Sequence, residues 1–172
     1  SKVRSTFAEI LVNHGYSHES AAVLCRARDT VSLIAGSGDS WGQGATEHFA
    51  RAAFSRDRNG DIADAFTHAV DGAFQLLNGP PSTLRSAVLS GTEDLLANAV
   101  RRIIWAFLRT PATGIPPASL NAKSDWLPKL KANLAPLLTT LDTNCGLPYI
   151  ANWSFRVRSN KLTDKPLRPQ DL

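Results

Sequence analysis

Apolar side chains recur at helical spacing between residues 62 and 77, and this stripe restricts the fold more than any other feature of the chain. Its members are Ile62, Phe66, Ala69, Val70, Ala73, Phe74 and Leu77. Positions three, four, seven or eight residues apart share one side of an α-helix, so the stripe predicts an amphipathic helix with one buried side. Asn-Gly-Pro-Pro at residues 78–81 ends the pattern, because proline cannot continue a helix.

Shorter stripes of the same period predict further helices along the chain. They cover residues 3–11, 18–35, 45–57, 82–90, 92–109 and 127–141. The segment 82–90 is either separate from 92–109 or continuous with it across Gly91. Pro136 predicts a kink, or a division into two short helices, in the last segment. Residues 110–124 contain three prolines and a glycine and predict an extended connector.

The pattern changes after residue 142. Residues 144–148 predict a turn, and apolar and polar side chains then alternate with the two-residue period of an extended chain. The alternating residues are Trp153, Phe155 and Val157 on one side and Ser154, Arg156 and Arg158 on the other. We expect either a lone strand or an arm on another surface here, and a tail in the last dozen residues. The predicted fold is all-α, a bundle of six or seven helices in residues 1–142 with an extended C-terminal arm in residues 143–172.

The composition is that of an ordinary globular protein and excludes few functions. Hydrophobic residues make up 43% and charged residues 20% of the 172 positions, which allows one domain with a sizeable core. We expect no membrane span and no signal peptide, because no apolar run reaches the required length. Cys25 and Cys145 have no metal or redox spacing and are expected to be reduced thiols. The net charge of +4 is a weak preference for anionic partners.

One side of the helix predicted at 62–77 carries candidate metal ligands. They are Asp61, Asp64, His68 and Asp71. Carboxylates and a histidine at this spacing can hold a divalent metal inside a helical bundle. The same side lies opposite the apolar stripe, however, so we expect it to face solvent, with Asp61 and Asp64 as cap and first-turn acids. We therefore predict no metal ion and no cofactor.

Other catalytic or ligand-binding patterns are weak. Gly15 separates His14 from His18 and interrupts the continuous helix that such a ligand pair needs. The glycine-rich loop at 36–44 lacks the Lys-Ser/Thr pair of a P-loop and follows a predicted helix, not a strand. No spacing indicates a Ser/His/Asp or Cys/His nucleophile, so we do not expect an enzyme.

The helix predicted at 92–109 carries an unusual group of side chains, a tryptophan among arginines on its polar side. Thr92 is its expected N-cap, and Thr110-Pro111 its expected stop. Its apolar side consists of Leu96, Val100, Ile103, Ile104 and Phe107. Trp105 falls on the opposite, polar side. The arginines three or four residues from it are Arg101, Arg102 and Arg109.

Three interpretations of this tryptophan stay open. The first is nucleic-acid binding, in which arginines contact phosphates and bases stack on Trp105 or Trp153. The arginines concerned are Arg101, Arg102, Arg109, Arg156 and Arg158. The second is a protein interface, where tryptophan and arginine are enriched. The third is internal packing, in which the C-terminal third of the chain covers Trp105 and arginines stack on its ring.

Residues 103–120, IIWAFLRTPATGIPPASL, carry a resemblance to a known family. A tryptophan near a helix end, then Arg109-Thr110-Pro111, and Pro116-Pro117 after four further residues is similar to the last long helix and proline-rich turn of hepadnavirus core (capsid) proteins. The resemblance implies an all-helical shell protein in which Trp105, Arg109, Pro111 and Pro116 contact other subunits. In this chain Trp105 lies farther from the Arg-Thr-Pro, and residues 118–172 contain no arginine-rich tail. Helical coat proteins of rod-shaped viruses have the same general features.

Together these patterns favour association over catalysis. We expect a self-assembling structural subunit of the capsid or nucleocapsid type, cytoplasmic or in a virion, that packs against its own copies and contacts nucleic acid. The expected assembly residues are Trp105, Arg109, Pro111, Pro116, Trp153 and Phe155. The expected nucleic-acid contacts are Arg101, Arg102, Arg156 and Arg158. The alternatives are a small helical enzyme or metal-binding protein that uses Asp61, Asp64 and His68, and a monomeric helical adaptor.

Overall fold

The computed structural model describes residues 44–158 and 162–167. The chain divides into two units, Ser1–Asp39 with Leu172 and Ser40–Asp171, and all the described residues belong to the second. The predicted helices at 3–11 and 18–35, the His14/His18 pair, Cys25 and residues 36–43 lie outside the described residues.

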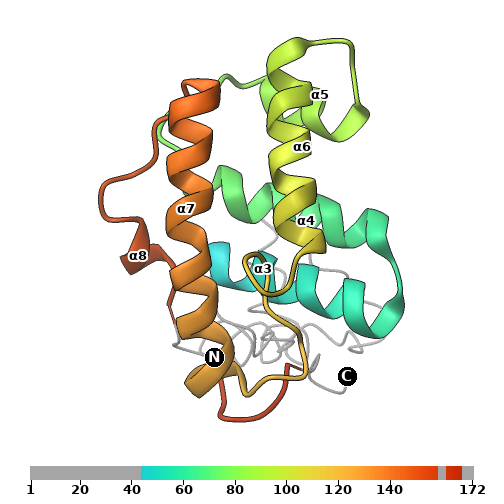
Figure 1. The fold of residues 1–172 in the computed structure, drawn as a ribbon, viewed down its shortest axis with the longest axis vertical. Coiled ribbons are helices and arrows are strands. Elements are labelled where there is room, and N and C mark those ends of the chain that lie inside the picture. The colour runs from blue at the N-terminus through green and yellow to red at the C-terminus, as the bar shows by residue number, and fades with distance from the viewer. Residues whose placement is uncertain (1–43, 159–161, 168–172) are drawn as a thin grey trace, which may run out of the picture. The chain divides into compact units, whose positions relative to one another are not determined.

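The described residues confirm the all-α prediction, and no strand occurs among them (Figure 1). The α-helices are α3 (Ala45–Phe54), α4 (Ile62–Phe74), α5 (Leu84–Ser90), α6 (Leu95–Arg109), α7 (Leu127–Cys145) and α8 (Trp153–Arg156). Two wider π-helical turns adjoin them, η2 (Ser55–Asn59) after α3 and η3 (Ala122–Trp126) before α7. The stripe that predicted a helix over 62–77 corresponds to α4.

Small residues let α3 and α4 approach closely. The fully or almost fully buried alanines are Ala45, Ala50, Ala52 and Ala53 of α3 and Ala65, Ala69 and Ala73 of α4. Phe49 of α3 is 0% exposed, and a methyl group added at Gly72 of α4 would lie 3.0 Å from three of its ring carbons. Gly72 therefore leaves the space that the Phe49 ring occupies. The neighbour of Phe49 in the sequence, His48, is consequently held beside α4.

Helix α6 packs against α4, α5 and α7, and its apolar side faces them as predicted. Its N-terminus differs from the prediction. The helix begins at Leu95, and the carboxylate of Asp94, not Thr92, caps it by accepting a 2.9 Å hydrogen bond from the Ala97 amide. An aspartate two residues nearer the apolar stripe satisfies a free amide of the first turn, which Thr92 is too far away to reach.

Helix α5 is separate from α6. Gly91 follows α5 with a φ of 70°, a left-handed conformation that ends a helix, so the predicted alternative of one continuous helix is wrong. Arg101 of α6 then binds the end of α5, because its guanidinium donates hydrogen bonds to the carbonyls of Val88 and Leu89. This contact joins the two helices across the turn.

Helix α7 continues through Pro136, so the predicted division into two short helices is wrong. Pro136 is exposed, and so is Ala132, whose carbonyl loses its helical partner because proline has no N–H. The leucines of the predicted stripe form the buried side, and they are Leu127, Leu130, Leu134, Leu137, Leu138 and Leu141. The helix ends at Gly146, whose φ is 63°. Cys145 is a free cysteine, and burial raises the pKa of its thiol.

The predicted extended connector is instead a compact turn folded onto the end of α6. The amides of Gly114 and Ile115 donate to the carbonyls of Thr110 (2.7 Å) and Phe107 (2.9 Å). A methyl group at Gly114 would lie 1.7 Å from the Phe107 carbonyl oxygen, so only glycine fits. Proline and glycine content predicted the absence of a helix, but it did not predict that the turn would be buried.

Arg56 and Asp57 of η2 hold this turn in place. The Arg56 side chain is 8% exposed and donates to the carbonyls of Leu108 (2.7 Å), Ile115 (2.8 Å) and Pro116 (3.3 Å). Asp57 pairs with Arg56 and accepts the Ala118 amide at 2.7 Å. Burial alone would raise the pKa of Asp57, but these hydrogen bonds and the arginine charges hold it below its usual value.

The chain after α7 corrects two further predictions. Residues 153–156 form the single helical turn α8 and no strand, and Val157 is fully buried although it was grouped with Phe155. Residues 162–167, predicted as part of a tail, pack on the helical unit. Leu162 and Leu167 are buried, and residues 165 and 167 exchange backbone hydrogen bonds with residues 122 and 118.

Candidate association surface and histidine cluster

Trp105 is covered by other parts of its own chain. Its ring stacks on Phe66 of α4, with the ring centroids 4.3 Å apart and the planes inclined by 9°. The guanidinium carbon of Arg109 lies 4.6 Å from the centre of the Trp105 ring. Internal packing with a stacked arginine was one of the three interpretations; the described ring contacts come from α4 and α6, whereas that interpretation named the C-terminal third. The side chain is partly buried.

The arginines around Trp105 differ in exposure. Arg101 is held inside the unit by the two α5 carbonyls, and its guanidinium carbon lies 5.0 Å from the centre of the Phe66 ring. Arg102 and Arg109 are exposed. Of the expected phosphate contacts on α6, Arg102 is therefore placed on the surface, whereas Arg101 has a structural role.

The two prolines that carried the family resemblance lie within the turn after α6. Pro111 is half-buried and Pro116 is buried. The Pro116 carbonyl accepts hydrogen bonds from the indole Nε1 of Trp126, at 3.1 Å, and from Arg56. In this unit Pro116 thus joins the turn to η3 and η2.

Helix α8 holds an exposed aromatic residue in a fixed position. Phe155 is 71% exposed, and its neighbours Arg156 and Arg158 are also exposed. On one side Trp153 packs partly buried against the core, and on the other Val157 is 0% exposed. The Arg158 amide also donates a 2.8 Å hydrogen bond to the hydroxyl of Thr46 in α3. Phe155 therefore projects from a segment anchored at both ends.

A second exposed apolar residue lies at the start of α6. Leu95 is 88% exposed, and the exposed acids Glu93 and Asp94 precede it. Sequence reasoning missed this position, because Leu95 lies off the apolar stripe and a single exposed leucine has no sequence signal of its own. Figure 1 shows α8 well apart from the α5–α6 junction where this segment begins.

The four residues proposed as metal ligands divide into two pairs. Asp61 is the N-cap of α4 and accepts the Asp64 amide at 2.9 Å, as predicted for a capping acid. Asp64 accepts a hydrogen bond from the Ser55 hydroxyl. Contrary to expectation, His68 and Asp71 do not face open solvent. Their side chains are only 17% and 18% exposed, because α3 lies against this part of α4.

His48 of α3 completes a cluster with His68 and Asp71. The Nδ1 atoms of the two histidines are 3.4 Å apart, and Oδ2 of Asp71 lies 4.0 Å from Nδ1 of His48. Sequence reasoning missed His48 as a partner of this face. The position of His48 next to Phe49 could have indicated this partnership only if the packing of Phe49 on Gly72 were known, and the sequence does not show that packing.

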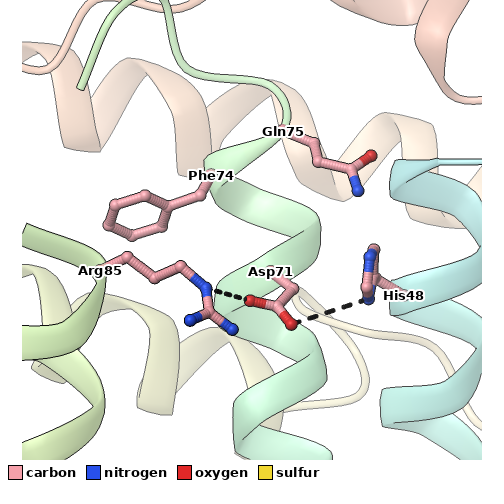
Figure 2. Close-up of a pocket in the computed structure, with 5 residues that line it drawn as sticks. All are labelled: His48, Asp71, Phe74, Gln75 and Arg85. Carbon is pink, nitrogen blue, oxygen red and sulfur yellow. Dashed lines mark hydrogen bonds and ion pairs between the residues drawn. The ribbon is translucent and has the colours of Figure 1, made fainter. Parts of the chain in front are cut away.

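An open hollow of about 330 Å³ adjoins the cluster. His48, Asp71, Phe74, Gln75 and Arg85 line it, and Figure 2 shows Asp71 between Arg85 and His48. Arg85 of α5 donates to Oδ1 of Asp71 at 2.6 Å, and this hydrogen bond raises the pKa of Arg85. The contact ties the end of the cluster to a third helix.

Comparison with known proteins gives no family for this chain. No protein-family model matches it, and neither the curated proteins nor the solved structures contain a match. The resemblance to hepadnavirus core proteins over residues 103–120 therefore stays a prediction. Among the described helices, none has the length and hydrophobicity needed to cross a membrane.

Proposed function

We propose that this protein is a self-associating structural subunit of the capsid or nucleocapsid type. In the proposed contact, α8 of one copy packs against the start of α6 of the next. The observation that carries the proposal is Phe155, an aromatic side chain 71% exposed on an anchored helical turn. Large exposed aromatic residues beside arginine are typical of interface anchors.

The anchoring of α8 matters because binding costs conformational entropy. A side chain on a loose tail loses backbone freedom when a partner covers it, whereas Phe155 is already fixed by Trp153, Val157 and the Arg158–Thr46 hydrogen bond. Burial of its ring on association would therefore contribute most of its hydrophobic free energy to affinity, about 2 kcal/mol.

Charge complementarity favours a second copy as the partner. Phe155 is followed by the exposed Arg156, and Leu95 is preceded by the exposed Glu93 and Asp94. Two α8 segments facing each other would bring arginines together, which is unfavourable. An α8 segment facing the start of α6 pairs opposite charges around two apolar residues. Where α8 and the start of α6 meet only once between two copies, the contact is head-to-tail and generates rings or filaments.

Charge reversal tests this contact directly. Glu93→Arg and Arg156→Glu, each alone, are expected to weaken self-association by about tenfold or more, measured by light scattering over a range of concentrations. The double variant is expected to recover affinity, because it exchanges the two charges. Lys129→Glu, an exposed site on α7, is the matched control and should leave association unchanged. A wild-type chain that stays monomeric at every concentration contradicts the proposal.

Nucleic acid is the second proposed partner, in keeping with a nucleocapsid role. The supporting observation is that Arg102, Arg109, Arg156 and Arg158 are exposed. Binding of a single-stranded oligonucleotide should weaken steeply with salt, and Arg102→Ala and Arg156→Ala should each reduce the slope by about one. Binding that does not depend on ionic strength would remove nucleic acid from the proposal and leave self-association untouched.

A further inference from the structure

We propose that His48, His68 and Asp71 bind one divalent transition-metal ion of the zinc class, with the fourth coordination position open to the adjoining hollow. The proposal is independent of self-association, because it uses none of the residues at α8 or at the start of α6. It joins α3 to α4 through two imidazole nitrogens and one carboxylate oxygen, all within 4.8 Å of one another.

The distance between the histidines fits a shared metal. Two nitrogens bound to Zn²⁺ at about 2.0–2.1 Å in tetrahedral geometry lie roughly 3.3 Å apart. The Nδ1 atoms of His48 and His68 are 3.4 Å apart. At this distance the two atoms can also share a hydrogen bond, whose proton a bound ion would displace. The two rings are thus already spaced as ligands of one ion.

Asp71 is oriented to supply the third ligand. Its Oδ1 atom accepts the 2.6 Å hydrogen bond from Arg85, and Oδ2 is the atom directed at His48, 4.0 Å from Nδ1 (Figure 2). A rotation of the Asp71 side chain that brings Oδ2 from 4.0 Å to roughly 3.3 Å from His48 Nδ1, the separation of ligand atoms in a tetrahedral site, would allow it to coordinate. Arg85 leaves this oxygen available, and its partly exposed guanidinium is screened by solvent from the charge of the ion.

A second layer of contacts orients His68. Its remote ring nitrogen, Nε2, lies 3.6 Å from Oδ1 of Asp64, and Oδ2 of Asp64 accepts the Ser55 hydroxyl. A carboxylate beside the remote nitrogen favours the proton there and places the ring's lone pair on Nδ1, the arrangement common for histidine ligands of metals. This is an observation separate from the spacing of the three ligand atoms.

The set of donor atoms selects the class of ion. Ca²⁺ and Mg²⁺ prefer oxygen ligands, whereas two imidazoles and one carboxylate suit Zn²⁺, Co²⁺, Ni²⁺ or Cu²⁺. Three protein ligands with an open position are typical of zinc sites that also bind water or an exogenous ligand. Here the open position adjoins the hollow lined by Gln75 and Arg85.

Equilibrium dialysis of the full chain against Zn²⁺, after treatment with EDTA, tests the site. We expect about one equivalent of zinc in the wild type, and affinity at least tenfold lower in His48→Gln and in His68→Gln. Asp64→Asn should weaken binding by about tenfold through the orientation of His68. The remaining histidines of the chain, at 14 and 18, provide the control His14→Gln/His18→Gln. Zinc binding that is unchanged in His48→Gln and His68→Gln overturns the proposal.

A measurement on the wild type covers the case in which a ligand variant fails to fold. In ¹⁵N-labelled protein, added Zn²⁺ is expected to shift the Nδ1 resonances of both His48 and His68 to values of metal-bound nitrogen. Co²⁺ in place of Zn²⁺ should give the visible absorption bands of a tetrahedral site. Unshifted Nδ1 resonances at one equivalent of Zn²⁺ overturn the proposal without any substitution.

Discussion

Trp105 and Phe155 are both aromatic residues beside arginines, and both were predicted to contact other subunits, yet the structure treats them differently. Trp105 stacks on Phe66, and Arg109 lies over its ring. Phe155 is 71% exposed while the residues around it are anchored. The side chains around Trp105 make their contacts within one chain, whereas Phe155 exposes its ring to solvent.

The comparison shows that a helical wheel separates an apolar side of a helix from a polar side, but does not show which other helices reach the polar side. The apolar pattern of the sequence places Trp105 on the polar side of α6, but α4 packs against α6 closely enough for Phe66 to reach the ring. An aromatic residue among arginines therefore does not by itself indicate an external partner. The exposure of the ring after folding separates the two cases.

Phe66→Ala tests the internal group with the largest expected effect. Phe66 is 4% exposed and contacts both Trp105 and Arg101, so its removal should lower the free energy of unfolding by about 3–5 kcal/mol. Urea denaturation measures this loss. Ile62→Ala on the same helix, at a side chain 36% exposed, is the control and should cost less than about 1.5 kcal/mol. Equal losses would show that Phe66 has no special role.

Asp57→Ala should cost about 1–3 kcal/mol, because it leaves the buried Arg56 and the Ala118 amide without their shared acceptor. The pKa of Asp57 is lowered in the folded chain, so its contribution is present above the unfolded value, near 3.9, and is lost as pH falls through the folded value. The free energy of unfolding of the wild type should thus fall below about pH 4 more steeply than that of Asp57→Asn. Parallel pH profiles would contradict this assignment.

Arg109→Ala should lower stability by about 0.5–1 kcal/mol through the loss of its contact with the Trp105 ring. Arg102→Ala on the same helix should change stability by less than about 0.5 kcal/mol, since Arg102 is exposed. Thermal unfolding of the two variants under identical salt measures the difference. If both behave alike, the stacked guanidinium contributes nothing measurable and the contrast with Phe155 weakens.

Phe155→Ser is expected to have the smallest effect on stability and a large effect on association. The exposed ring contributes less than about 0.5 kcal/mol to folding, so the melting temperature should hardly change. Self-association measured by light scattering should fall by at least tenfold. The opposite pattern, a destabilised chain that associates normally, would place Phe155 with Trp105 as an internal residue.

The sequence predicted the elements that depend on local chemistry. The stripe that became α4, the stop at Thr110-Pro111 and the buried leucines of α7 are confirmed. What could not be predicted depends on contacts distant in the chain. Trp105 is covered by a residue 39 positions earlier, α8 is helical where the alternation of residues 153–158 predicted an extended chain, and the turn at 110–118 is buried because Arg56 donates to its carbonyls.

The candidate sites show the same division. His68 and Asp71 were identified as possible ligands because they share one side of a helix. Their partner His48 could not be identified, because its position depends on the space that Gly72 leaves for Phe49. The packing of α3 on α4 is tertiary structure. The hydrophobic pattern of alanine-rich helices is compatible with many ways of packing them, so it does not specify this one.

The position of Arg56 in the chain has a kinetic consequence. Its three acceptors lie 52, 59 and 60 residues further along, so these bonds form only after α4, α5 and α6 have brought the two segments together. Closing a chain segment of this length costs conformational entropy before its bonds can form, so we expect the Arg56 bonds to be made after the folding transition state. Arg56 should therefore act mainly on the rate at which the folded chain opens, and hardly on the rate at which it forms.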